Sequence, residues 1–189
     1  GADKQDAENA AAEAAKKTAT TGRVKRINEL NFLIYMTDLM LTDAVAPDEA
    51  VGLFAEKLSQ CFNGATVSVL LTVGDQILRV LCQKRTSSDL VQQTTPLLAG
   101  QERSVAEVPL VADVYAKGGV CTALDAPTSL AKLCFGIPQQ PAGFVGFILI
   151  EDFKQSADLL GADVNYLKLV GVSVRGFLLQ LALVKPLAA

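Results

Sequence analysis

The sequence predicts an α+β fold, in which an antiparallel β-sheet is flanked by a long helix at each end of the chain. Two observations lead to this prediction. Apolar residues recur at every third or fourth position over residues 23–45 and 163–185, which is typical of amphipathic helices. Two pairs of short apolar runs, within 66–83 and 133–150, are each joined by a turn that contains glycine, which is typical of β-hairpins. Hairpins between terminal helices pack as an α+β layer fold.

The N-terminal 22 residues are predicted to be an alanine-rich linker or helical arm, separate from a domain over residues 23–189. They have strong helix propensity but almost no large apolar side chain to bury. The sequence TATTG at 18–22 is expected to break this arm before a second helix begins. That helix has apolar residues on two sides. One side is a heptad-like seam of Val24, Ile27, Leu30, Ile34 and Leu41, and the other contains Phe32, Tyr35 and Leu39.

The middle of the chain is predicted to contain a helix, a hairpin and an irregular cover. Proline and acidic residues typically start a helix, and a glycine next to aspartate favours a two-residue hairpin turn. The expected elements are a helix from Pro47 to Asn63-Gly64, strands over 66–73 and 76–83 joined by Gly74-Asp75, a short helix near Asp89, a short helix ended by Gly118-Gly119, a strand over 120–124 and a loop over 125–129.

The second hairpin has strands over 133–137 and 144–150 that are apolar on both faces, so we expect both to be central strands covered on both sides. Pro141 and Gly143 suit the turn between them. Gly146 interrupts the second strand, which indicates a bulge or a close approach by another backbone. The approaching group is either a bulky neighbour or a ligand.

The last helix is expected to begin after an N-cap at Asp163 and to end near Lys185. Its apolar residues form two stripes, so it should contact the sheet on one side and something else on the other. Arg175 interrupts the apolar run, and we therefore expect no membrane span. The first stripe comprises Val164, Leu167, Gly171, Val174, Leu178 and Leu181, and the second comprises Leu169, Val172, Leu179 and Leu183.

Composition excludes several classes of function. A net charge of -3 gives no field that would attract nucleic acid or an anionic membrane. The absence of histidine removes the commonest general base, the commonest transition-metal ligand and the usual proximal haem ligand, so neither a metal nor a cofactor is expected. The cysteines lack metal-ligand spacing and are interpreted as reduced apolar side chains in a cytoplasmic protein, although a redox role for one pair stays open. They are Cys61, Cys82, Cys121 and Cys134.

From about Asn28 to Lys185 the sequence resembles a GAF domain, a relative of the PAS fold. Three segments carry the resemblance: TVSVLLTVGDQILRV after a helix, VADVYAKGGVCTALDAP, and FGIPQQPAGFVGFILIEDF before the terminal helix. The resemblance implies a regulatory sensor that binds a small molecule and relays a signal to a downstream domain or protein. Two alternatives stay open, namely a ligand-free dimerisation module of the same fold and a thiol-dependent reductase.

The known branches of that family fit this sequence poorly. Of the Asn-Lys, Phe and Asp-Glu set of cyclic-nucleotide-binding members, FKQSADLLGAD retains only Phe153. Phytochrome-type members need a chromophore cysteine, usually beside a histidine, and some haem-binding members use a histidine ligand, but this chain has no histidine. Cys121 in KGGVCTA is the nearest match to the methionine sulfoxide reductases, but the surrounding motif is missing. An enzyme is therefore not expected.

The resemblance places a ligand pocket between the sheet and the cover over residues 84–129. Three of the candidates also have a structural interpretation. Arg79 could be a surface charge, Tyr115 could close the core, and Asp125 could fix the turn before Pro127. Asp113 and Asp125 are both interpreted as structural. The candidate ligand-binding residues are Arg79, Tyr115, Cys121, Thr122, Asp125, Ser129 and Cys134.

The resemblance also implies a homodimer, because the corresponding terminal helices of the family pair across a two-fold axis. We expect a four-helix bundle in which Gly171 and Gly176 allow close helix approach. Its predicted seam comprises Ile27, Ile34, Leu41, Gly171, Val174, Leu178 and Leu181.

Overall fold

The computed structural model of the protein describes residues 2–42, 44–87, 96–154 and 164–183, with the side chains of 17–26 excepted. Within these ranges the order of elements agrees with the predicted α+β class. The elements are α1 (Ala2–Met40), α2 (Pro47–Cys61), β1 (Thr66–Gly74), β2 (Ile77–Lys84), β3 (Glu102–Ser104), the 3-10 helix η1 (Val105–Glu107), α3 (Pro109–Lys117), β4 (Val120–Asp125), β5 (Leu130–Pro138), β6 (Phe144–Lys154) and α4 (Val164–Leu183).

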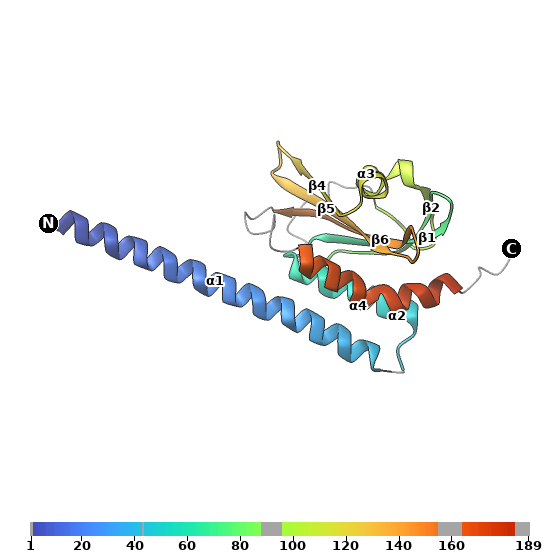
Figure 1. The fold of residues 1–189 in the computed structure, drawn as a ribbon, viewed down its shortest axis with the longest axis horizontal. Helices are drawn as coiled ribbons and strands as arrows, with labels where there is room; N and C mark the ends of the chain where they lie inside the picture. Colours follow the sequence, from blue (N-terminus) through green and yellow to red (C-terminus); the bar gives the residue numbers. More distant parts are fainter. Residues whose placement is uncertain (1, 43, 88–95, 155–163, 184–189) are drawn as a thin grey trace.

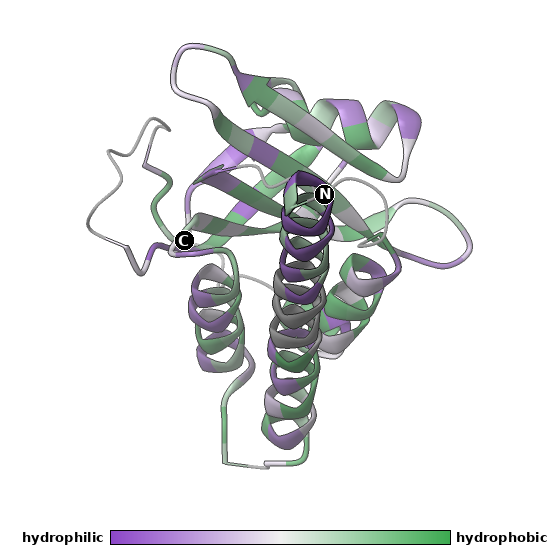
Figure 2. Ribbon diagram, turned by 90° about the vertical axis from the view of Figure 1, so that its left-hand side faces the viewer, coloured by the Kyte–Doolittle hydropathy of each residue, from purple (hydrophilic) through white to green (hydrophobic). Residues whose placement is uncertain are grey.

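The six strands form one antiparallel sheet in the order β3-β2-β1-β6-β5-β4. Helices α1, α2 and α4 lie on one side of this sheet, and α3 lies on the other (Figures 1 and 2). Strand β6 is central, between β1 and β5, and is covered on both faces. Its alternate residues therefore face two different cores, which explains why the run at 144–150 is apolar throughout.

The larger core lies between the sheet and the layer of α1, α2 and α4, and Ile148 and Ile150 of β6 belong to it. The smaller core lies beneath α3 and contains the intervening residues Phe147 and Leu149. Its other buried members are Leu70, Leu78, Val80, Val105, Leu110, Val111, Val114 and Cys134. The fold therefore has a buried apolar core on each side of the sheet.

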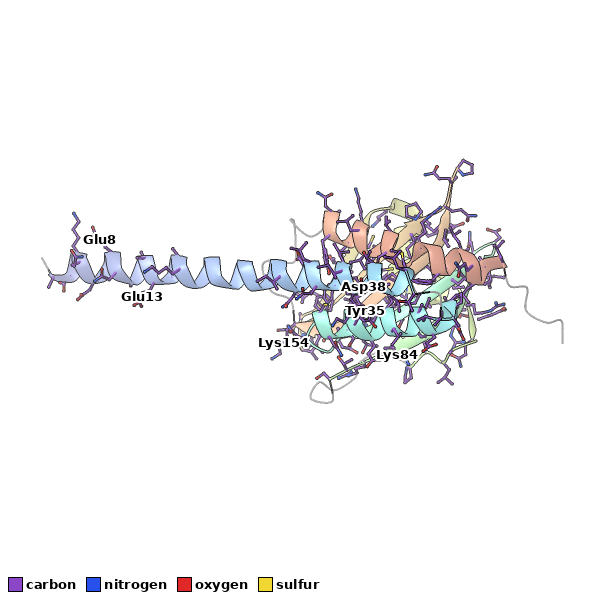
Figure 3. All side chains as sticks on the ribbon, turned by 90° about the horizontal axis from the view of Figure 1, so that it is seen from below. Glu8, Glu13, Tyr35, Asp38, Lys84 and Lys154 are labelled. Carbon is purple, nitrogen blue, oxygen red and sulfur yellow. The ribbon has the colours of Figure 1, made fainter. Side chains whose placement is uncertain are left out.

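The predicted break at 18–22 is wrong, because α1 continues without interruption from Ala2 to Met40. A glycine inside a helix costs about 1 kcal/mol relative to alanine, and strong helix formers support the helix on both sides of Gly22: alanines before it, and arginine, lysine, glutamate and leucine after it. The first part of α1, where Glu8 and Glu13 lie, projects away from the body, whereas Tyr35 and Asp38 lie where α1 crosses α2 and α4 (Figure 3). The boundary of the domain at residue 23 stays a prediction.

Smaller differences concern the hairpin turn and the cover. The first turn consists of Asp75 and Gln76, one residue later than predicted, and Gln76 takes a φ of 54°. Strand β3 was not predicted, because its three residues are polar and show no apolar alternation. The strand is held by its pairing with β2. The predicted helix near Asp89 and the predicted N-cap at Asp163 lie outside the described residues.

Gly146 has the close backbone approach that its place in an apolar strand indicated. It sits opposite β1, and a Cβ atom at this position would collide with the carbonyl oxygen of Leu70. The approaching group is therefore a neighbouring strand of the same protein rather than a ligand. Glycine is needed here because β1 and β6 could not otherwise keep their hydrogen-bonding distance.

The two stripes of α4 have opposite environments, which corrects part of the predicted dimer seam. Val174 and Leu178 are fully buried against the protomer's own sheet and helices, and Gly171 contacts Phe135 and Ile137 of β5. These three positions are occupied by the core and are not available to a second copy. Leu181 is half-buried against the same core. The second stripe is the outer one, and its exposed members are Leu169, Val172 and Leu183.

On α1 the three predicted seam residues Ile27, Ile34 and Leu41 are exposed, while Phe32 and Met36 are buried in the larger core. The helix therefore has the two apolar sides that its sequence indicated. Whether the exposed side pairs with a second copy stays a prediction.

Helix α4 is long and apolar enough to cross a membrane by length and composition, with a mean hydropathy of 1.4, although its sequence includes Arg175. Core helices of the same length also pass this test, and the inner stripe of α4 packs against the sheet. The Nε of Arg175 donates a hydrogen bond of 3.1 Å to the carbonyl oxygen of Pro138, which ties the helix to the end of β5.

Candidate functional site

A cavity of about 520 Å³ opens between the start of α3, the β4–β5 hairpin and the second half of β6. Its volume lies within the range of small-molecule sites. Its apolar wall consists of Val108, Pro109, Leu110, Ala123, Leu124, Leu130 and Leu149. Its polar groups are Asp113, Asp125, Thr128, Lys132, Glu151 and Asp152. Four carboxylates and one ammonium group therefore share one pocket.

Glu151 is a buried carboxylate that lines the cavity and forms an ion pair with another of its residues. It is only 7% exposed, and its Oε2 lies 3.4 Å from Nζ of Lys132 on β5. Burial raises the pKa of Glu151, the Lys132 ammonium lowers it in part, and the neighbouring Asp152 raises it further. The ion pair with Lys132 therefore offsets part of the desolvation cost of this buried carboxyl group.

A β-bulge brings Glu151 and Asp152 together at this place. Ala131 pairs with Phe153 and Leu133 pairs with Ile150, so Lys132 alone faces two residues of β6. Asp152 takes a φ of 59°, which lies in the left-handed region. The irregular backbone lets two consecutive acidic residues line the same cavity, where a regular strand would point them to opposite faces.

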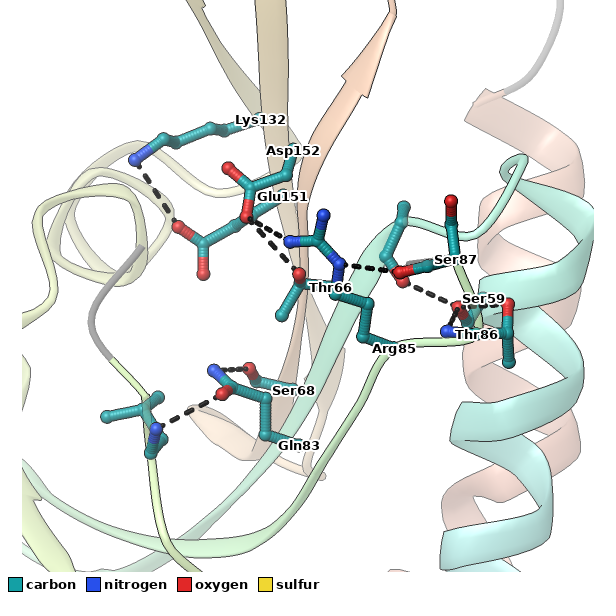
Figure 4. A network of polar contacts seen from close by, with 12 residues as sticks. Ser59, Thr66, Ser68, Gln83, Arg85, Thr86, Ser87, Lys132, Glu151 and Asp152 are labelled. Atoms are coloured by element: carbon teal, nitrogen blue, oxygen red, sulfur yellow. Dashed lines mark hydrogen bonds and ion pairs between the residues drawn. The ribbon is translucent and has the colours of Figure 1, made fainter. Parts of the chain in front are cut away.

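Asp152 also belongs to a buried polar network (Figure 4). Its Oδ2 accepts a hydrogen bond of 3.2 Å from the hydroxyl of Thr66 and lies 3.6 Å from Nη1 of Arg85. The Nε of Arg85 donates to the carbonyl oxygen of Ser87 at 2.9 Å. The network thus joins the end of β6 to the start of β1 and the end of β2.

Asp125 has the structural role expected of it and also lines the cavity. Its carboxylate accepts hydrogen bonds from the backbone N–H and the hydroxyl of Thr128, and its carbonyl oxygen accepts one from Ser129. Ser129 takes a φ of 58° in this turn. Asp113 reaches the same cavity from α3. The packing of α3 against β4 and β5 therefore brings Asp113 and Asp125 to one cavity, although both were interpreted as structural.

The other candidate ligand residues do not line the cavity. Arg79 lies on β2 and forms an ion pair of 3.3 Å with Glu102 of β3, which matches its alternative as a surface charge. Tyr115 is exposed, with its ring 6.4 Å from that of Phe144. Thr122 and Ser129 are exposed at β4 and the hairpin turn.

Cys121 and Cys134 also lie outside the cavity, in or against the smaller core. The reason is that Phe147, Val111 and their neighbours fill the space beneath the middle of α3. The open space is displaced toward the first turn of α3, so only Asp125 of the predicted set borders it.

The cavity residues that the prediction missed are chiefly Lys132, Glu151 and Asp152. One signal for them existed in the sequence: two consecutive acidic residues end an otherwise apolar strand, IEDF, and buried charges usually need partners. Their partners, Lys132 and Arg85, are far from them in sequence and are found only in the folded chain.

Metal coordination does not explain the carboxylates. Over the part of the chain that the structure describes, no three histidine, cysteine, aspartate or glutamate side chains come close enough to hold a metal ion.

Replacing Glu151 by glutamine tests its environment through pH. Because the folded pKa of Glu151 is raised above its ordinary value of 4.5, the folded state binds more protons than the unfolded state in the window between the two values. Stability therefore falls there as pH rises, and Glu151→Gln removes this titration. We expect the free energy of unfolding of the wild type, relative to the variant, to decrease as pH rises above about 4.5. Urea unfolding at several pH values measures this difference, and a difference that grows in the opposite direction would contradict the assignment.

No protein-family model and no curated protein sequence matches the chain. Solved structures do match it. A GAF domain from A. aeolicus in an inactive state is 12% identical, covers 83% of this chain and 98% of its own, and has a TM-score of 0.61. The phycoerythrobilin-bound GAF domain from a cyanobacterial phytochrome is 12% identical, with coverages of 82% and 98% and a TM-score of 0.61. Free methionine-R-sulfoxide reductase from Neisseria meningitidis, in complex with its substrate, is 13% identical, with coverages of 82% and 87% and a TM-score of 0.56.

These likenesses extend over most of the chain at low identity, and they establish its fold. The protein has a GAF-domain fold, as its sequence resemblance indicated.

Proposed function

We propose that this protein is a cytoplasmic regulatory sensor domain that binds a small molecule in the cavity beneath the start of α3. The observation that carries the proposal is the buried carboxylate of Glu151 on the floor of a cavity of about 520 Å³. A buried charge is costly, and a domain built only for stability gains little by retaining one next to an open space. A polar anchor inside a largely apolar pocket is typical of ligand sites.

The charges of the cavity favour a cationic ligand. Glu151 is paired with Lys132, and Asp152 is paired with Arg85. Among the described residues, Asp113 and Asp125 form no ion pair, so two carboxylates of the cavity have no neutralising side chain. A ligand with an ammonium or guanidinium group and a small apolar body would complement these charges and the leucine-rich wall, whereas an anion would be repelled.

The terminal helices are suited to pass on a signal. The C-terminal part of α1 contacts α2 and α4, and its N-terminal part projects from the domain as a long arm. A shift of α1 within the domain would therefore move that arm as one rigid rod. The exposed residues Ile27, Ile34 and Leu41 on α1 offer an apolar side for a second copy, and we propose a homodimer that joins there. A downstream domain or protein would receive the signal from these helices.

A second candidate is the ligand-free dimerisation module. The observation in its favour is the filled smaller core, where Phe147, Val111 and Cys134 occupy the space beneath the middle of α3.

The third alternative, a thiol-dependent reductase, has less support. Burial raises the pKa of Cys82 to about 11 and raises the pKa of Cys134 as well, and both shifts reduce the fraction of reactive thiolate.

The ligand proposal is tested by thermal unfolding of the full chain with phenethylamine and with phenylacetate, which share an apolar body and differ in charge. We expect millimolar phenethylamine, and not phenylacetate, to raise Tm, because ligand binding to the folded state alone stabilises it. Asp113→Asn should weaken the binding of phenethylamine roughly five- to tenfold, which corresponds to about 1 to 1.4 kcal/mol for the loss of one charge contact.

Asp75→Asn is the matched control, since it removes the same charge from an exposed turn outside the cavity. It should leave the effect of phenethylamine unchanged. If neither compound shifts Tm while sedimentation finds a dimer, the ligand-free module is favoured and the sensor proposal fails.

A further inference from the structure

Two of the cysteines lie directly opposite each other in the sheet. The register of β4 and β5 pairs Cys121 with Cys134, and both thiols are free. Side chains of directly opposite residues in antiparallel strands project from the same face of the sheet. Here that face is the one covered by α3, because Cys134 belongs to the smaller core and Cys121 packs against it.

The spacing of such a pair suits a disulfide. Directly opposite residues in antiparallel strands have Cα atoms about 4.5 or 5.5 Å apart, depending on their hydrogen bonding. Disulfides span Cα distances of roughly 4.4 to 6.8 Å. The bond can therefore form without separating the two strands.

We propose that Cys121 and Cys134 are a peroxide-responsive thiol pair that closes into a cross-strand disulfide. Cys121 is the thiol that reacts first, because it is partly accessible on the edge strand, whereas Cys134 is buried. Its thiolate attacks one oxygen of hydrogen peroxide, the O–O bond breaks, and hydroxide leaves, so that Cys121 becomes a sulfenic acid.

Cys134 then completes the reaction. Its sulfur loses a proton and attacks the sulfur of Cys121, the S–O bond breaks, and the departing hydroxide takes up the proton to give water. In total two thiols are oxidised to one disulfide and one peroxide is reduced to two waters. Burial raises the pKa of Cys134, so we expect this second step to be slow.

The consequence goes beyond the ligand-binding function proposed above. Strand β4 is an edge strand held only by β5 among the described strands, and its residues Ala123, Leu124 and Asp125 form one wall of the cavity. A disulfide two positions before this wall fixes β4 against β5. Oxidant and ligand would then act on the same part of the fold.

The other cysteines serve as internal controls. Cys61 is exposed at the end of α2, and Cys82 on β2 donates a hydrogen bond of 3.9 Å to the carbonyl oxygen of Val51. Neither of them faces another cysteine in the strand registers. A non-selective oxidation would modify exposed Cys61 before any other thiol.

The test is treatment of the reduced full chain with hydrogen peroxide, followed by intact mass measurement and peptide mapping without reductant. In the wild type and in Cys61→Ser we expect loss of the mass of two hydrogen atoms, a peptide link between Cys121 and Cys134, and full reversal by dithiothreitol. In Cys134→Ala the link is absent, and dimedone labels Cys121 as a sulfenic acid. The disulfide between Cys121 and Cys134 is detected in the wild-type protein, so the test does not require any variant to fold.

Four free thiols in the wild type after this treatment would overturn the proposal. So would a disulfide that uses Cys61 or Cys82, or oxidation of Cys121 that dithiothreitol does not reverse.

Discussion

Leu178→Glu is expected to unfold the domain, not merely to separate two copies of it. Leu178 is 0% exposed in the inner stripe of α4. The substitution removes about 1.5 to 3 kcal/mol of apolar burial and places an unpaired carboxylate in the larger core, which costs several kcal/mol more. The sum is comparable to the whole stability of a typical domain, about 5 to 15 kcal/mol. Circular dichroism and urea unfolding at micromolar concentration measure the loss.

Two matched variants separate folding from association. Leu169→Glu changes an exposed position of the same helix, and we expect a change in stability within about 0.5 kcal/mol. Ile34→Glu changes an exposed position of α1, and if the proposed dimer joins there, sedimentation should find a folded monomer. A folded Leu178→Glu protein that has only lost its partner would contradict the burial of this stripe.

Asp152→Ala is expected to destabilise the domain by about 3 to 5 kcal/mol, the usual effect of removing one partner of a buried ion pair. Asp152 is 1% exposed, and its carboxylate is the ion-pair partner of Arg85 and accepts the hydroxyl hydrogen bond of Thr66. The substitution leaves the Arg85 guanidinium largely buried without that carboxylate. Denaturant unfolding monitored by circular dichroism gives the change in free energy.

A double-mutant cycle identifies the cause of this loss. Arg85→Met combined with Asp152→Ala should be less destabilised than the sum of the two single variants, because neither charge is then left buried alone. Arg79→Met is the control, since it breaks the exposed ion pair with Glu102, and such pairs contribute at most about 1 kcal/mol. Strict additivity at Arg85 and Asp152 would show that their charges do not stabilise each other.

Local patterns determined most of the fold. The period of apolar residues placed α2, both hairpins and α4, and runs that were apolar on both faces identified β5 and β6 as covered strands. The two stripes of α4 and the two sides of α1 were also visible in the sequence, because each stripe repeats with the helical period. The predicted break at 18–22 was wrong, because residues of low helix propensity do not end a helix when strong helix formers lie on both sides of them.

Only the tertiary structure decided which stripe faces inward and where the open space lies. Both stripes of α4 are apolar, so periodicity alone could not choose between them. In the folded chain the stripe of Gly171, Val174 and Leu178 packs against the sheet. The cavity depends on a bulge that places Lys132 opposite Glu151 and Asp152, and on α3 filling one part of that face of the sheet and not another. Such choices come from contacts between residues far apart in the chain, and a local pattern carries no information about them.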